Sequence, residues 1–193
     1  MEFECKGQVF GRRDFDSLIS DSPELLNWCF NLIKDNMESR QSKSQFMPWC
    51  KKTKLQELQD PLTRFIIIFD LAQNPIGFAS YQLTTEPDMQ DVPIPCLYWY
   101  ELHVVKNYRN FGLGGYLVTT IEEIARKNIS KCQKIMLTAF KSLPKNKLYR
   151  SPIDFYTRHG FKCDPISPSQ CLKPKEAAVY DYEIMSKDVL IIF

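Results

Sequence analysis

The chain has 193 residues, a net charge of +2 from 25 basic and 23 acidic residues, and 44% hydrophobic residues. This length and apolar content suit a globular domain with a sizeable core. The nearly even charge balance argues against a nucleic-acid-binding protein, because such domains are usually strongly basic. No stretch approaches the roughly 18 apolar residues of a membrane span. The charged residues 1–16 lack the apolar run of a signal peptide. We therefore expect an intracellular protein with no membrane partner.

Cysteine and histidine usage argues against a disulfide framework and against a metal centre. The seven cysteines are Cys5, Cys29, Cys50, Cys96, Cys132, Cys163 and Cys171. An odd number without close pairs fits neither paired disulfides nor a zinc site. His103 and His159 are the chain's two histidines. We expect reduced thiols and no bound metal.

The first strong element is a helix over residues 20–37. Asp21 or Ser22 can cap it, and Pro23 suits its first turn. Its apolar positions recur at helical spacing, at Leu26, Cys29, Phe30, Ile33 and Met37. The polar stretch 38–60 predicts a loop with a short helix. Within this stretch, "CKKTK" is a weak basic cluster.

Further along the chain, strands alternate with helices. Apolar and β-branched or aromatic runs predict strands at 64–70, 77–83, 96–105, 134–140 and 180–187. An acidic, proline-containing loop is expected at 84–95. Helical spacing predicts a helix at 113–127, and a short helix closed by Gly160 is expected at 151–161. This alternation predicts an α/β or α+β domain around a central sheet.

A glycine-rich turn joins the strand at 96–105 to the helix at 113–127. It reads Arg109-x-x-Gly112-x-Gly114. Free amides at a helix start point outward and the helix dipole favours negative charge, so this turn suits a phosphate group. The Walker A pattern fails here because Gly115-Tyr116 follows where Lys-Ser/Thr is needed, and the dinucleotide spacing is also wrong. A turn that binds no ligand is the alternative.

The glycine turn, together with the later "DFYTRHGF", resembles the GNAT superfamily of acetyl-CoA-dependent N-acetyltransferases over roughly residues 64–187. The stretches "LNWCFNLIKDNM", "LYWYEL", "RNFGLG", "LTAFK", "FYTRHGF", "ISPS" and "YEI" are similar to the N-terminal acetyltransferase D subfamily (NatD). The resemblance implies a GNAT fold, with a mixed, mostly antiparallel sheet flanked by helices. It also implies one domain over residues 1–193, with a helical N-terminal segment 1–60 packed on a core at 61–193.

The resemblance further implies three sets of site residues. The cofactor-binding set is Leu102, His103, Val104, Arg109, Asn110, Phe111, Gly112, Leu113, Gly114, Gly115 and Asn146. The catalytic set is Glu101, Tyr100 and Tyr156. The substrate-binding set is Trp49, Glu86, Tyr98, Tyr100 and Tyr182. Asn146 is the candidate for the family's asparagine after the "TAFK" strand, in a stretch that carries an insertion.

Several of these residues have other interpretations. Glu101 lies in an aromatic strand, where partial burial predicts a raised pKa suited to a general base, but a solvent-facing strand glutamate is the alternative. His103 shares a strand face with Glu101 and is a weaker catalytic candidate. A β-bulge would let both Tyr100 and Glu101 reach the site. Tyr156 is either a general acid or ordinary helix packing, and Trp49 is either a substrate wall or a packed anchor.

For the substrate, the resemblance implies histone tails that begin Ser-Gly-Arg-Gly, with acetyl-CoA as acetyl donor. Glu86, Asp88 and Asp91 are placed to meet the arginine, although this chain has Thr84 where relatives have a second acid. A solvated acidic loop is the alternative. We expect a monomer of the cytoplasm and nucleus. The rival functions are acetylation of another amine, such as a lysine side chain or polyamine, and a module that binds tails or acetyl-CoA without turnover.

Overall fold

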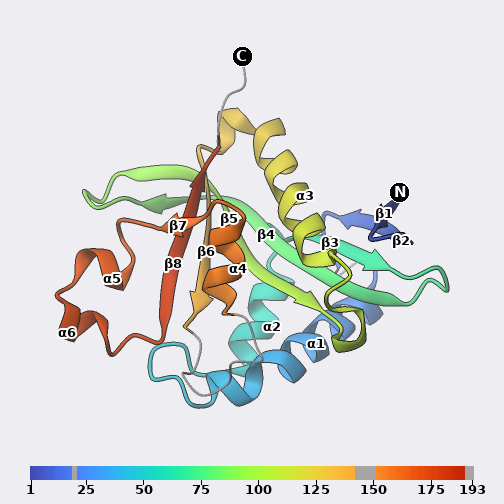
Figure 1. The fold of residues 1–193 in the computed structure, drawn as a ribbon, viewed down its shortest axis with the longest axis horizontal. Helices are drawn as coiled ribbons and strands as arrows, with labels where there is room; N and C mark the ends of the chain where they lie inside the picture. The colour runs from blue at the N-terminus through green and yellow to red at the C-terminus, as the bar shows by residue number, and fades with distance from the viewer. Residues whose placement is uncertain (19–20, 142–150, 190–193) are drawn as a thin grey trace. The chain divides into compact units, whose positions relative to one another are not determined.

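The structure is a computed structural model that describes residues 1–18, 21–141 and 151–189. Among these residues, eight strands form one sheet in the order β1-β2-β3-β4-β5-β6-β8-β7 (Figure 1). The chain divides into two compact units, unit 1 with Met1–Gln82 and Tyr100–Thr120, and unit 2 with Leu83–Trp99 and Ile121–Phe193. β4 (Pro75–Pro87), β5 (Pro93–Val104) and α3 (Leu113–Lys127) contribute residues to both units.

Unit 1 is a helix-covered antiparallel sheet. Its remaining elements are β1 (Glu2–Cys5), β2 (Gln8–Phe15), α1 (Pro23–Gln41), α2 (Lys51–Gln59), β3 (Arg64–Phe69) and the 3-10 turn η1 (Lys106–Tyr108). β1 pairs with β2, β2 with β3 and β3 with β4, all antiparallel. α1 and α2 lie side by side (Figure 1). The inner face of α1 packs with Leu58 of α2 on the apolar residues of β3 and β4, at Leu26, Cys29, Phe30, Ile33, Phe65, Ile67, Phe69 and Phe78.

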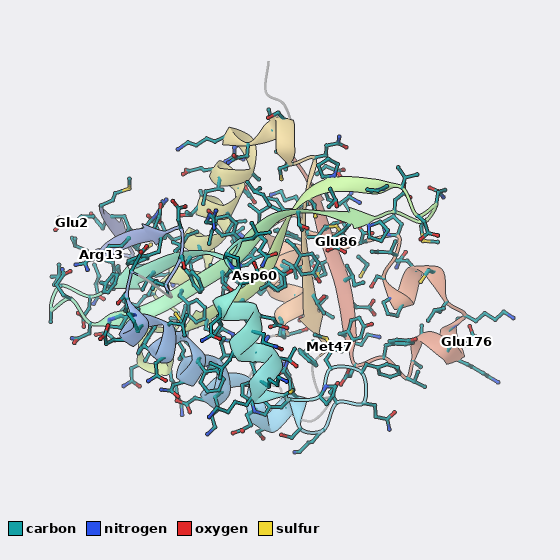
Figure 2. The ribbon with its side chains drawn as sticks, turned by 180° about the vertical axis from the view of Figure 1, so that it is seen from behind. Glu2, Arg13, Met47, Asp60, Glu86 and Glu176 are labelled. Carbon is teal, nitrogen blue, oxygen red and sulfur yellow. The ribbon has the colours of Figure 1, made fainter. Side chains whose placement is uncertain are left out.

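The first fifteen residues correct one expectation. Residues 1–60 were expected to be helical, but β1 and β2 form a hairpin before α1. Lys6 and Gly7 connect the strands with φ of 49° and 77°, the positive values of a tight hairpin turn. Glu2 and Arg13, one on each strand, are labelled in Figure 2. The sequence did not predict the hairpin because it contains many charged residues. Most of these side chains face solvent, so the strands show little alternation of apolar and polar residues.

Unit 2 contains a parallel strand pair. Its further elements are η2 (Ile129–Lys131), β6 (Lys134–Phe140), α4 (Pro152–Arg158), β7 (Lys162–Cys163), α5 (Pro168–Cys171), α6 (Pro174–Ala177) and β8 (Tyr182–Asp188). β6 runs parallel to β5, whereas β8 is antiparallel to both β6 and β7. α4 lies against β6 (Figure 1). Gly160, at φ 83°, follows the end of α4, as expected from the sequence.

The predicted class, α/β with a mixed and mostly antiparallel sheet, is confirmed. The expected strands at 64–70, 77–83, 96–105, 134–140 and 180–187 correspond to β3, β4, β5, β6 and β8. β4 and β5 extend further than expected into the stretch 84–95, which leaves a short turn at residues 88–92. The single-domain expectation stays a prediction. In the part of the chain that the structure describes, no helix is long and apolar enough to cross a membrane.

The core position of β3 gives a stability prediction. Ile67 is fully buried in unit 1, so replacing it with Ala should lower the free energy of unfolding by about 2–5 kcal/mol. Leu71, which is 71% exposed just after β3, is the matched control and should change stability by less than about 0.5 kcal/mol as Leu71→Ala. Urea unfolding measures both. Equal effects of the two substitutions would contradict the assigned core.

Candidate active site

Glu101, near the end of β5, is held at both carboxylate oxygens. The ammonium of Lys54 in α2 donates to Oε1 at 2.7 Å, and Nε2 of His103 lies 2.6 Å from Oε2. The side chains of Glu101, Lys54 and His103 are only 11%, 14% and 8% exposed. The expected shared face of Glu101 and His103 is confirmed by their direct contact. The alternative interpretation, that Glu101 faces solvent, is therefore wrong.

The predicted rise in the pKa of Glu101 is also wrong. Burial does raise it, but the charge of Lys54 and the hydrogen bond from His103 lower it by more, so the pKa of Glu101 falls to about 2. The same attraction raises the pKa of Lys54, against the effect of its own burial. Both groups are therefore ionised at neutral pH.

A hydrogen-bond chain fixes the tautomer of His103. Nη2 of Arg109 donates to Oδ1 of Asn36 at 2.6 Å. Because arginine can only donate, this contact turns the Asn36 amide so that its Nδ2 faces Nδ1 of His103, at 3.2 Å. Nδ1 must then accept, so the proton of a neutral His103 is on Nε2, where it is donated to Glu101.

The glycine turn has the backbone that an anion site needs. Asn110 and Gly112 have φ of 70° and 91°. The amide of Tyr116 makes the first bond of α3, to the carbonyl of Gly112, so the preceding amides lie at the open start of a fifteen-residue helix. Lys6, at the tip of the N-terminal hairpin, donates from Nζ to the carbonyl of Asn110 and adds a positive charge beside the turn.

The expected backbone-binding segment 102–104 lies next to a close strand contact. A Cβ on Gly77 of β4 would lie 3.1 Å from the His103 carbonyl, so only glycine fits there without displacement. Leu102 and Val104 are partly exposed, and the Val104 carbonyl accepts from Nε of Arg109 at 3.1 Å. Arg109 therefore connects the glycine turn to the end of β5.

In unit 2, three of the expected substrate residues come together. The hydroxyl of Tyr98 lies 2.8 Å from Oγ1 of Thr138. Burial raises the pKa of Tyr98, and the nearby Glu86 carboxylate and the ionised form of Tyr182 raise it further. Glu86, labelled on β4 in Figure 2, is partly buried, which raises its pKa as well.

Asp88 and Asp91 lie in the turn between β4 and β5, and their expected part in recognising the arginine stays a prediction. Asp88 accepts from the amides of Gln90 and Val92 at 2.8 and 2.9 Å, so its carboxylate organises the turn between β4 and β5. Asp91 is exposed in the same turn at φ 59°.

The other expected side chains have mixed outcomes. Trp49 packs against the core of unit 1, 6.1 Å from the Phe30 ring, as the anchor interpretation expects. Tyr156 packs edge-on against Trp99 and Phe161 within unit 2. Tyr100 is 37% exposed. The predicted role of Asn146 falls outside the described residues.

The part of the chain that the structure describes shows no metal-binding cluster at the site. Within residues 1–18, 21–141 and 151–189, no group of three or more His, Cys, Asp or Glu side chains is arranged to hold a metal, and the expected absence of a metal stays a prediction. Two hollows in unit 1, of about 200 and 530 Å³, lie around Asp70 and Leu71 and contain none of the expected site residues.

The sequence analysis did not single out Lys54 of α2, which contacts Glu101, or Asn36 of α1, which contacts His103. A signal for Lys54 was present. It precedes Leu58 by four residues, so both lie on one face of α2, and that face is buried. The weak basic cluster at residues 50–54 therefore includes a buried lysine. Asn36 carried no comparable signal, because its partners come from distant parts of the sequence.

Comparison with known proteins identifies the family. The acetyltransferase (GNAT) family matches residues 24–161. N-alpha-acetyltransferase 40 of Saccharomyces cerevisiae is 25% identical over 191 residues, which cover 79% of this chain and 66% of the yeast protein, so the chain spans just under two thirds of this relative.

Solved structures agree on the fold. Arabidopsis thaliana NAA60 in complex with a bisubstrate analogue has a TM-score of 0.64 at 14% identity, covering 94% of this chain and 99% of that one. An aminoglycoside 6′-N-acetyltransferase complexed with coenzyme A has a TM-score of 0.62 at 15% identity, covering 94% and 98%. These likenesses confirm the expected GNAT fold. With its family match over most of its length, the chain belongs to the acetyltransferase (GNAT) family.

Proposed function

We propose that this protein transfers an acetyl group from acetyl-CoA to the N-terminal α-amine of histone tails that begin Ser-Gly-Arg-Gly. The observation that carries the proposal is the ionised Glu101 carboxylate, in the same unit as the glycine turn of a GNAT family chain. The similarity to yeast N-alpha-acetyltransferase 40 supports an α-amine as acceptor. Action in the cytoplasm and nucleus, as a monomer, remains part of this proposal.

The residues of the glycine turn fit the diphosphate of acetyl-CoA. The turn offers amides at the start of α3, a glycine without a side chain at position 112, and the nearby charges of Lys6 and Arg109. We assign residues 109–115 to the diphosphate and the backbone of residues 102–104 to the acetyl end. Bound there, acetyl-CoA supplies a thioester whose thiol, if it resembles that of cysteine with a pKa of about 8.5, leaves without strong acid assistance.

Glu101 is a weak base, and an α-amine requires no stronger one. An α-amine has a pKa of about 7.7–8.0, so an appreciable fraction is neutral at pH 7. The Glu101 carboxylate attracts and orients the amine, and it accepts the proton, directly or through water, as the new C–N bond forms and the C–S bond breaks. Amides of residues 102–104 stabilise the developing negative charge on the carbonyl oxygen.

The aromatic and acidic residues of unit 2 suit a peptide that contains an arginine. Glu86 is partly buried beside Tyr98, so its carboxylate can pair with a guanidinium at reduced exposure to solvent. Tyr98 and Tyr182 provide flat surfaces for a glycine-rich backbone. Tyr156 remains a proposed general acid, and Trp49, Tyr100 and Asn146 remain proposed binding residues.

The glycine turn yields a binding prediction. Gly112→Ala should weaken acetyl-CoA binding by about tenfold or more, because a side chain at φ 91° is strained and its Cβ would occupy the diphosphate approach. Cys5, at 3.8 Å, is the nearest side chain to that Cβ, so the chain itself does not clash. Isothermal calorimetry measures the affinity.

Gly160→Ala is the matched control for this prediction. Gly160 has a similar φ of 83°, and its Cβ would meet the flexible end of Lys187. The control should lose stability in the same way but keep its acetyl-CoA affinity. An unchanged affinity in folded Gly112→Ala would contradict the diphosphate assignment.

The function itself is tested by intact-mass spectrometry of three peptides incubated with the protein and acetyl-CoA. One begins Ser-Gly-Arg-Gly-Lys, one is the same peptide blocked at its N-terminus, and one begins Met-Asp. We expect one acetyl group on the first peptide and none on the others. Acetylation of the blocked peptide would indicate lysine as acceptor. No transfer despite acetyl-CoA binding would contradict the proposed function.

Glu101→Gln supplies the catalytic control for that assay. It should lower kcat by about 100-fold or more, because the amide cannot accept a proton, while acetyl-CoA affinity changes little. A wild-type rate for this variant would exclude Glu101 from the mechanism.

Recognition of the arginine is tested by a double-mutant cycle. Glu86→Gln should lower kcat/KM for the Ser-Gly-Arg-Gly peptide by about tenfold, the value of one charge-assisted hydrogen bond. For a Ser-Gly-Ala-Gly peptide the same substitution should have little effect. An equal loss on both peptides would show that Glu86 does not recognise the arginine.

A further inference from the structure

Lys54 is an unusual residue in unit 1, a lysine that is largely buried. Its side chain is 14% exposed, although lysine is almost never buried unless it is paired. Two carboxylates meet its ammonium, Glu57 one turn further along α2 and Glu101 of β5. Glu57 is 34% exposed and shares a helix with Lys54, so the contact that crosses between elements is the one with Glu101.

Stability is a poor explanation for this pair. Removing both charges from water costs much of what their attraction returns, so a buried ion pair is often no better for stability than an apolar pair of similar size. α2 is mostly polar, and Leu58 is its buried residue. α2 therefore places a cation beside Glu101 despite the free energy needed to remove both charges from water, which suggests a role in the chemistry of that carboxylate.

The other carboxylate oxygen, Oε2, is held by His103. His103 donates from Nε2 because Asn36 occupies its Nδ1, and Asn36 is in turn oriented by Arg109. This contact orients the carboxylate and lowers its pKa, but by less than the charge of Lys54 does. Lys54 therefore does more than His103 to keep Glu101 ionised.

We propose that Lys54 is a positioning residue for acetyl transfer, which keeps the Glu101 carboxylate ionised and fixes its orientation against His103. This inference rests on the proposed role of Glu101. In the wild-type protein it means that the acid side of the pH–rate profile reflects protonation of the substrate amine and not of Glu101.

The groups around Glu101 determine what loss of Lys54 would do. α2 contributes Lys54 and Glu57, and α1 contributes the buried thiol of Cys29. β5 contributes His103, whose orientation Arg109 influences indirectly through Asn36. Burial raises the pKa of Cys29, and the charge of Glu101 raises it further, so this thiol is neutral. Without Lys54, burial would still disfavour the charged carboxylate while the largest attraction opposing it would be lost, so protonation of Glu101 would become easier.

The experiment compares the wild type with Lys54→Met, Lys54→Arg and Glu57→Gln. Lys54→Met keeps the length of the chain without the charge, Lys54→Arg keeps the charge, and Glu57→Gln removes the other carboxylate that contacts Lys54. Carbon-13 NMR of labelled glutamate carboxyl groups follows the titration of Glu101, assigned with Glu101→Gln. The pH dependence of kcat and the affinity for acetyl-CoA are measured for each variant.

In the wild type and in Lys54→Arg, Glu101 should remain ionised down to about pH 4. In Lys54→Met, its titration midpoint should rise by about two pH units or more, and kcat relative to the wild type at the same pH should fall by about tenfold one pH unit below that raised midpoint. Acetyl-CoA affinity should be unchanged, and Glu57→Gln should stay within about threefold of the wild-type kcat. A purely structural role would not move the titration.

An unchanged Glu101 titration and pH profile in Lys54→Met would overturn the inference. If Lys54→Met does not fold, Lys54→Gln provides the same neutralisation with a polar side chain and the same two outcomes. The titration also separates this inference from the proposed function. If the wild type acetylates no peptide, the function fails, while the NMR comparison still decides whether Lys54 controls Glu101.

Discussion

The ion pair between Lys54 and Glu101 is the constraint on which the rest of the candidate site depends. Each charge is largely buried, and each would be costly without the other. The pair ties the short polar helix α2 to the end of β5. It also fixes which oxygen of Glu101 is left for His103, and through Asn36 that contact extends to Arg109 in the glycine turn. One contact therefore organises both the Glu101 carboxylate and its connection to the glycine turn.

Much of the fold followed from the sequence, and most of this network did not. The run of isoleucines in β3 and the glycines before α3 carry strong local signals, because burial and positive φ each require particular residue types. The hairpin of β1 and β2 was missed because its charged strands show no apolar alternation. Local pattern locates an element well, but it does not report which distant charge lies opposite a residue.

Glu101 illustrates this limit. Its partial burial was foreseen from its aromatic strand, and burial was expected to raise its pKa. The opposite result comes from Lys54, 47 positions earlier in the chain, and from the proton that His103 donates. The direction of the pKa shift thus depends on a tertiary contact between a residue of a helix and a residue of a strand. Burial and charge act in opposite directions here, and at less than 3 Å the charge has the larger effect.

A carboxylate that resists protonation also bears on the choice of substrate. A lysine amine, with a pKa of about 10.4, is almost entirely protonated at neutral pH and would need a strong base to release its proton. A base whose pKa is about 2 does this poorly. An α-amine near pKa 8 is partly neutral already, so it needs a fixed negative charge that orients it and a weak acceptor for the proton released on attack. The electrostatics of Glu101 therefore favour α-amine over lysine acetylation, independently of the likeness to yeast N-alpha-acetyltransferase 40.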